Sequence, residues 1–170
     1  KGTVNLHASL LPQYRGAAPI NHAIINGEKE TGLTTFLLDK EIDTGEIMIQ
    51  EKVVIEDDET AGTLHDKLML LGNKVVVDTI KMIEEGRVVS QSQDDIIHRD
   101  KMQLKPAPKI FKEDCKIDWT KDAKSIYDFI RGLSPYPAAH TQFVSDKGDA
   151  MDVKIYETAI ETKTPHDGEK

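Results

Sequence analysis

An amide and an imidazole stand two positions apart near the beginning of the chain, at Asn5 and His7. Residues 3 to 8 alternate enough to predict a β-strand, in which side chains at i and i+2 project from the same face. The two side chains would then lie together at the strand end, with Asn5 as a hydrogen-bond donor and His7 as a proton-transfer group. Polar residues at a strand end can equally serve to satisfy nearby backbone groups, so the pair alone does not establish a site.

A carboxylate at Asp43 lies in a short polar link, LDKEIDTGEI at 38 to 47, between two apolar runs. An Asp-Thr-Gly turn is ordinary hairpin chemistry, because Asp hydrogen-bonds its own backbone and Gly accepts a positive φ. Together with Asn5 and His7, however, Asp43 supplies the donor, the proton-transfer group and the carboxylate that acyl transfer needs. Neither the Asn-Leu-His nor the Ile-Asp-Thr-Gly motif includes a nucleophilic Ser or Cys, which favours direct attack by a substrate amine over a covalent acyl-enzyme.

The apolar pattern predicts the elements that must position these residues. The Asp43 link is expected to join two strands that pair as a hairpin, and a long amphipathic helix is expected to cover the sheet. The predicted elements are, in chain order, a strand at 3–8, a short helix from Pro19 to Asn26-Gly27, strands at 33–38 and 47–55, and a helix at 63–85.

Residues 91 to 114 lose the apolar periodicity and include two prolines, which predicts an interdomain linker. The overlapping stretch 99 to 124 holds eight Lys or Arg against five Asp or Glu, so it is locally basic in a chain whose net charge is −8. A basic stripe can meet a phosphate backbone, although a solvated linker would have the same composition.

A second unit begins with CKIDW at 115 to 119, where Ile117 and Trp119 are expected to anchor a core. Thr120 is a plausible N-cap for a helix that ends at Gly132. The pattern after this helix predicts a hairpin, with strands near 140–144 and 153–160. The aromatic residues of this region fall at core-like positions, so they are not expected to be base-stacking platforms; they are Phe111, Trp119, Tyr127 and Tyr136.

The composition is that of a soluble globular protein of one ordinary domain or two small ones, with 38% hydrophobic and 31% charged residues in a chain of 170. No apolar run approaches the length of a membrane span and no signal peptide is visible, which favours a cytoplasmic location. The single Cys115 cannot form an internal disulfide, and the six histidines form no cluster, so no metal site is expected.

Four segments together resemble the folate-dependent formyltransferases, most closely those that act on methionyl-tRNA; they are NLHASLLPQYRGAAPI at 5–20, LDKEIDTGEI at 38–47, CKIDW at 115–119 and IRGLSPYPAAHTQF at 130–143. The resemblance implies that Asn5, His7 and Asp43 form the catalytic triad. It also implies a folate-contacting loop that consists of Ser9, Leu10, Leu11 and Pro12.

The fold implied by this resemblance is α/β, with a partial Rossmann-like formyltransferase domain followed by a partial OB-like β-barrel domain. The expected boundaries are the C-terminal half of the catalytic domain at 1–90, a linker at 91–114 and the start of the OB-like domain at 115–170. The chain begins close to the active-site strand and ends in a polar stretch at 162–170, so we expect an internal fragment whose exposed edges favour self-association.

The function implied is transfer of a formyl group from 10-formyltetrahydrofolate to the amino group of initiator methionyl-tRNA, for translation initiation. Two alternatives stay open. One is another folate-dependent formyltransferase, acting on an amino sugar or a ribonucleotide. The other is an inactive fragment that retains only weak RNA binding, because we expect half of the folate pocket to precede residue 1.

Overall fold

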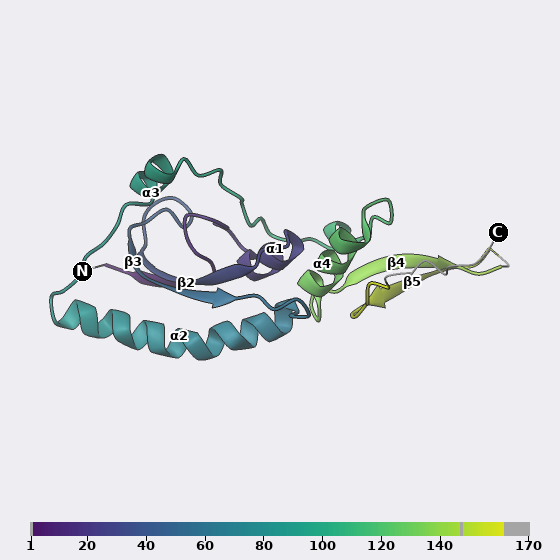
Figure 1. Cartoon of the computed structure of the whole chain (residues 1–170), viewed down its shortest axis with the longest axis horizontal. Helices are drawn as coiled ribbons and strands as arrows, with labels where there is room; N and C mark the ends of the chain where they lie inside the picture. Colours follow the sequence, from purple (N-terminus) through teal and green to yellow (C-terminus); the bar gives the residue numbers. More distant parts are fainter. Residues whose placement is uncertain (1, 147, 162–170) are drawn as a thin grey trace, which may run out of the picture.

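The computed structural model describes residues 2–146 and 148–161. Its first unit is an antiparallel sheet in the order β1-β2-β3, in which β2 pairs with both neighbours; the strands are β1 (Val4–His7), β2 (Glu30–Leu37) and β3 (Ile47–Val54). Helix α2 (Ala61–Glu84) runs along one side of the sheet, and helix α3 (Gln93–Asp100) lies on the other side (Figure 1).

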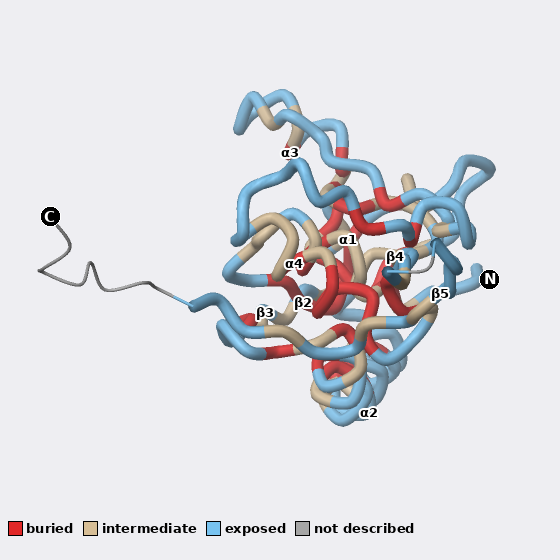
Figure 2. Tube along the Cα trace, turned by 90° about the vertical axis from the view of Figure 1, so that its right-hand side faces the viewer, coloured by how far each residue is buried: buried red, intermediate tan, exposed pale blue. Residues whose placement is uncertain are grey.

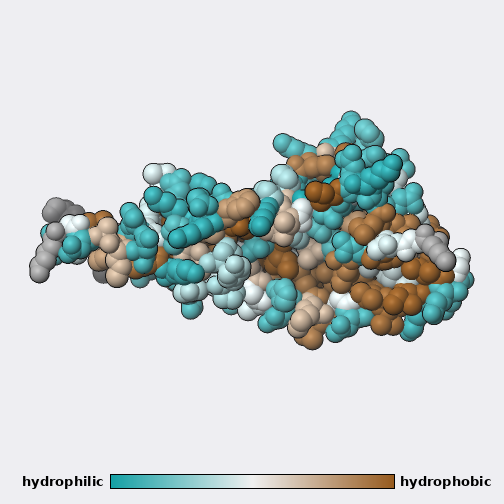
Figure 3. Space-filling model, turned by 180° about the vertical axis from the view of Figure 1, so that it is seen from behind, coloured by the Kyte–Doolittle hydropathy of each residue, from teal (hydrophilic) through white to brown (hydrophobic). Residues whose placement is uncertain are grey.

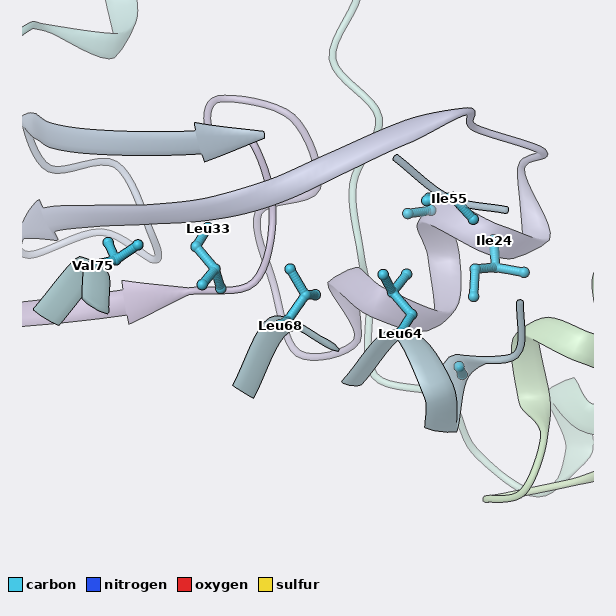
Figure 4. Close-up of a cluster of buried hydrophobic side chains, with 8 residues drawn as sticks. Ile24, Leu33, Ile55, Leu64, Leu68 and Val75 are labelled. Atoms are coloured by element: carbon cyan, nitrogen blue, oxygen red, sulfur yellow. The ribbon is translucent and has the colours of Figure 1, made fainter. Parts of the chain in front are cut away.

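Helix α2 packs on the sheet through one apolar stripe. Leu64, Leu68 and Val75 are buried at helical spacing against Leu33 of β2, as Figure 4 shows. Burial of each such side chain contributes about 1.5–3 kcal/mol. Thr60 begins the helix with a capping box, because its hydroxyl accepts from the amide of the third helical residue and that residue's hydroxyl accepts from the Thr60 amide.

Alternation along β2 separates its two faces. Thr35 faces α2, where its hydroxyl lies 2.9 Å from that of Thr79. Phe36 faces the other side and packs in a second cluster with Leu11, Ile47 and Ile96 of α3. Leu11 belongs to the loop after β1, so this face of the sheet brings that loop and α3 together.

The second unit consists of helix α4 (Ala123–Leu133) and an antiparallel hairpin of β4 (Ala139–Val144) and β5 (Ala150–Ile155), preceded by a short 3-10 turn at Glu113–Cys115. Helix α1 (Pro19–Ile25) joins the two units, because Gly132 of α4 packs against it and the Asn21 side chain donates to the Gly132 carbonyl at 2.8 Å. Figure 2 shows the buried residues at the centre of the molecule, with the exposed residues around them.

A buried ion pair strengthens this junction. Arg131, 5% exposed, donates through Nε to Asp128 at 2.8 Å and through Nη1 to the carbonyl of Glu59 at 2.8 Å. The guanidinium therefore links α4 to the segment that leads into α2. Removing one partner of such a buried pair typically costs about 3–5 kcal/mol.

Most predicted elements of the first unit are confirmed, including the short helix Pro19–Ile25 and the hairpin around the Asp43 link. The α/β class is also confirmed. The region predicted as a linker contains helix α3, with Ser92 as its N-cap, and this helix packs on the sheet. The polar stretch 162–170 lies outside the described residues.

The hairpin is confirmed, but its second strand is Ala150–Ile155 and not 153–160. Three further expectations for the second unit were wrong. Trp119 is 56% exposed, with its indole N–H donating to the Thr141 hydroxyl, so only Ile117 of the two expected anchors is in the core. Asp122, and not Thr120, caps α4, because its side chain accepts from the Ser125 amide. The expected core aromatics are largely on the surface, with exposed fractions of 56% for Phe111 and 81% for Tyr136.

The expected OB-like barrel is not seen as a closed sheet, since the described residues contribute only the two strands of the hairpin. Among residues 2–146 and 148–161, no helix is both long and apolar enough to cross a membrane.

Candidate active site

Strand β1 brings Asn5 and His7 to one face of the sheet. His7 is 7% exposed, and its ring meets the Phe36 ring edge-on, with the ring centres 6.5 Å apart. Asn5, two residues earlier, pairs with Phe36 across the strands but is exposed to solvent. Its amide makes no side-chain hydrogen bond to another residue in the described part of the chain. Asn5 is therefore free to bind a ligand, whereas His7 is held.

The backbone fixes the orientation of the His7 ring. Nε2 lies 2.9 Å from the carbonyl oxygen of Tyr14. A carbonyl can only accept, so Nε2 carries the proton and donates it. The other ring nitrogen, Nδ1, faces the Asp43 carboxylate at 3.7 Å from Oδ2. That distance exceeds a direct hydrogen bond but is closed by a small shift or a water molecule.

Asp43 lies in the link between β2 and β3, with a backbone φ of 56°. Its Oδ2 accepts a hydrogen bond of 2.9 Å from the Gly16 amide. The same oxygen is the one that lies 3.7 Å from Nδ1 of His7. Gly16 must be glycine, because its φ is 127° and a Cβ there would lie 2.3 Å from the Ala107 carbonyl oxygen. Ala107 also bonds the backbone on both sides of Gly16, donating to the Arg15 carbonyl at 2.8 Å and accepting from the Ala17 amide at 2.7 Å, so the Gly16 backbone is held where its amide donates to the carboxylate.

Gln93 and Arg15 are hydrogen-bonded to each other beside the site. Gln93, in the first turn of α3 and 2% exposed, accepts from the Arg15 guanidinium and donates to backbone carbonyls of the Asp43 loop. Arg15 thus braces the loop that follows β1. Gln93 was not expected in the site because it lies in the region predicted as a linker. The signal that predicts its helix is Ser92 followed three residues later by Asp95, a capping pattern.

The loop expected to contact folate is mostly packed into the protein. Ser9, Leu11 and Pro12 are buried, and Leu10 is half-buried. Ser9 donates to the Gln13 carbonyl at 2.6 Å, and the Thr34 hydroxyl donates to the Ser9 carbonyl at 2.6 Å. These contacts give the loop a fixed shape behind His7, with Leu10 as its most accessible side chain.

Tyr14, at the end of this loop, is anchored through its side chain. Its hydroxyl donates to Glu28 at 2.5 Å, and Glu28 also pairs with Lys105 at 2.5 Å. Burial raises the pKa of Tyr14, and the hydrogen bond to Glu28 raises it further. Burial acts to raise the pKa of Glu28 as well, but hydrogen bonds from Lys105 and Tyr14 outweigh it, and this pKa is lowered. Glu28 and Lys105 thus anchor the Tyr14 side chain, and the Tyr14 carbonyl accepts from His7.

The arrangement can support acyl transfer to an amine. An oriented imidazole faces a carboxylate, an exposed amide lies two residues away on the same face of the sheet, and no covalent nucleophile is needed.

Known proteins share both the sequence and the fold. Residues 1–80 match the formyl transferase family, and residues 109–169 match the formyl transferase C-terminal domain. Over 157 residues the chain is 56% identical to the methionyl-tRNA formyltransferase of Bacteroides fragilis and 60% identical to that of Azobacteroides pseudotrichonymphae. Each alignment covers 92% of this chain and 48% of the relative. The chain thus spans about half the length of the curated relatives it matches.

A solved structure shares the fold as well. A sugar 3N-formyl transferase, crystallised in the presence of dTDP and 5-N-formyl-THF, is 27% identical, with a TM-score of 0.64 over 76% of this chain and 46% of that one. The two matched domains, the sequence relatives and the shared fold agree, and the chain belongs to the formyl transferase family.

Proposed function

We propose that this chain carries the catalytic face of an enzyme that transfers a formyl group from 10-formyltetrahydrofolate to the amino group of initiator methionyl-tRNA. The observation that carries the proposal is the 3.7 Å approach of His7 to Asp43 beside the exposed Asn5, in a chain 56% and 60% identical to two methionyl-tRNA formyltransferases. Such an enzyme acts in translation initiation, and we propose the cytoplasm as its location.

The three side chains divide the chemistry. The substrate amine attacks the formyl carbon, and the Asn5 amide donates to the oxygen on which negative charge develops. One such donor is typically worth about 3 kcal/mol of the barrier. The Asp43 carboxylate takes the amine proton and passes it to Nδ1 of His7, which faces it, while the Nε2 proton stays on the Tyr14 carbonyl. His7 then delivers that proton from Nδ1 to the folate nitrogen as its bond to the formyl carbon breaks. The amine thereby becomes an amide, and the folate leaves as tetrahydrofolate.

The segment that leads to Asp43 is suited to the flat ring system of a folate. Leu38 and Ile42 are 49% and 76% exposed there, an apolar surface beside the polar triad. We propose that the loop of Ser9, Leu10, Leu11 and Pro12 forms a second wall, with Leu10 and backbone groups making the contacts because the other three side chains are buried.

The basic segment supports the nucleic-acid partner. Lys109 and Lys112 of this segment, together with Lys154 of β5, line one cavity of about 580 Å³ between the two units, to which Asp152 also contributes. None of the three lysines forms an ion pair with a carboxylate of residues 2–146 or 148–161. Tyr136, 81% exposed, lies at the same cavity. Unpaired ammonium groups beside an exposed ring suit a phosphate backbone and a base.

The hairpin supports the proposal that an OB-like barrel begins in the region 115–170, after a catalytic region at 1–90 and a linker at 91–114. Phe143 and Met151 lie directly opposite each other on neighbouring strands, and both are more than half exposed. An isolated two-stranded hairpin is only marginally stable in water, so this apolar face is expected to pack against further strands.

The proposed self-association has a surface to use. Strand β1 pairs only with β2 in the described part of the chain, which leaves one edge of the sheet open. Val76, Ile80 and Ile83 of α2 lie beside this strand and are each more than a third exposed, and Figure 3 shows apolar surface gathered on this unit. Sedimentation of the purified chain tests this; a monomer at all concentrations contradicts it.

The experiment for the function uses a hybrid protein, in which this chain replaces the aligned 157 residues of the Bacteroides fragilis relative. We expect the hybrid to formylate methionyl-tRNA with 10-formyltetrahydrofolate as donor. The matched control is the unaltered relative. A hybrid that formylates a dTDP-linked amino sugar, and not methionyl-tRNA, would show that the sugar alternative is correct.

A further inference from the structure

Gln93 ties together the two loops on which the position of Asp43 depends. Its side-chain oxygen accepts from Arg15 Nε at 3.0 Å and from Nη2 at 2.8 Å. Its side-chain nitrogen donates to the carbonyls of Asp43 at 2.9 Å and Gly45 at 2.7 Å. Both ends of the carboxamide are therefore occupied, one by the loop after β1 and the other by the link between β2 and β3.

Asp43 needs such support. Its φ of 56° lies in the left-handed region, which a residue other than glycine occupies at a cost of about 1–3 kcal/mol unless the surroundings hold it. Gln93 holds the backbone of Asp43 from one side, and the Gly16 amide holds the carboxylate from the other. Gly16 is the neighbour of Arg15, so both contacts belong to one network.

We infer that Gln93 is a positioning residue, whose carboxamide fixes the Asp43 backbone so that the carboxylate faces Nδ1 of His7. Only a carboxamide of this length offers an acceptor to the guanidinium and two donors to carbonyls. Gln93→Glu keeps the acceptor for Arg15 but loses both donors. Gln93→Met has a similar length and loses all four hydrogen bonds. The kinetic part of the inference rests on the proposed function.

The first test reads the Asp43 carboxylate through the Gly16 amide in NMR spectra of the purified chain. An amide that donates to a carboxylate gives a proton signal displaced downfield, and the displacement is lost when acid protonates the carboxylate. We expect this signature in the wild type and its loss in Gln93→Glu and Gln93→Met, with the remaining spectrum dispersed as for a folded protein.

A matched control is Gln50→Leu. The Gln50 amide also holds a loop, donating to the Leu11 carbonyl at 2.8 Å and to the Thr34 hydroxyl at 3.0 Å, but it makes no contact with Asp43. The Gly16 signature should persist in this variant. A Gly16 signal unchanged in both Gln93 variants would overturn the inference, as would its loss in Gln50→Leu, which would indicate a general loosening of the fold.

The second test measures kinetics in the hybrid protein. A displaced catalytic group lowers the rate of the chemical step, so Gln93→Glu should reduce kcat by about tenfold to a hundredfold while KM for either substrate stays within about twofold. Unchanged kcat, or a rise in KM alone, would overturn the positioning role. An unsubstituted hybrid without activity would refute the proposed function instead, and the Gly16 signal would still decide whether Gln93 positions Asp43.

Discussion

The docking of α4 on α1 can be tested at Gly132, where one added methyl group meets the neighbouring helix. A Cβ at this position would lie 2.7 Å from Cγ1 of Ile25, 3.0 Å from the Ile25 amide nitrogen and 3.2 Å from the Asn21 carbonyl oxygen. Two of these neighbours are backbone atoms, which cannot move aside as a side-chain end can. Overpacking of this kind costs about 1–3 kcal/mol, and the better helix propensity of Ala returns at most about 1 kcal/mol. Gly132→Ala should therefore destabilise the fold by roughly 1–2 kcal/mol.

Gly72→Ala in α2 is the matched control. A Cβ at Gly72 would lie 3.2 Å from Cδ2 of Leu6 and 3.7 Å from Cδ1 of Leu33, both of which are side-chain ends. Gly72 lies in the helix interior, where Ala gains its full helix propensity, and there is no backbone clash, so this variant should be neutral or stabilising. Urea unfolding followed by circular dichroism should separate the two variants by about 2 kcal/mol. Equal unfolding free energies would refute the reasoning, because the close α1–α4 contact would then carry no cost.

Three further predictions concern the site and its surroundings. Asn5→Ala should lower kcat of the hybrid by about a hundredfold and leave the urea midpoint unchanged, because the exposed amide acts only on the developing oxyanion; retained activity would remove Asn5 from the mechanism. The raised pKa of Tyr14 means that the phenol ionises at a lower pH in the unfolded chain than in the folded one. The free energy of unfolding should therefore fall as the pH rises above about 10, and it should fall less in Tyr14→Phe. Parallel pH profiles of the two proteins would contradict this. The lowered pKa of Glu28 means that its ionised form contributes to the free energy of unfolding above about pH 4.3, and this contribution is lost as the pH falls. Glu28→Gln should therefore lose less stability on acidification than the wild type. Identical acid unfolding profiles would count against this.

Local patterns predicted the first unit well because its signals are local. Pro19 opens α1 at a position where its missing amide proton is harmless, and Asn26-Gly27 ends it. The stripe from Leu64 to Val75 has a helical period and one buried face. The predicted hairpin around Asp43 follows in the same way from two β-rich runs and a turn sequence.

The second unit shows where local patterns are insufficient. Trp119 was expected in the core because of its size and hydrophobicity, yet its indole N–H bonds to Thr141 and leaves more than half of the residue exposed. Hydrophobicity alone does not specify which apolar side chain is covered. For the cap of α4, Thr120 and Asp122 are both good N-cap residues, and only the observed hydrogen bond to Ser125 distinguishes them.

In the candidate site, too, some contacts could be predicted from the sequence and others could not. The approach of His7 to Asp43 was expected from the motifs and from the family resemblance. The contribution of Gln93 was not, because its partners Arg15 and Asp43 are 78 and 50 residues away and no local pattern links them. The Tyr14 carbonyl that orients His7 is equally invisible in sequence, since any residue carries a carbonyl.

The most direct test of the account is a double-mutant cycle on His7 and Asp43 in the hybrid protein. If the two side chains act as one unit, His7→Ala, Asp43→Asn and the double variant should lower kcat by similar factors, each about a hundredfold or more. The control is the same cycle with Asp57, an exposed carboxylate outside the site, whose replacement by Asn should change kcat little. Independent, multiplicative losses for His7 and Asp43 would show that they do not cooperate and would contradict the proposed mechanism.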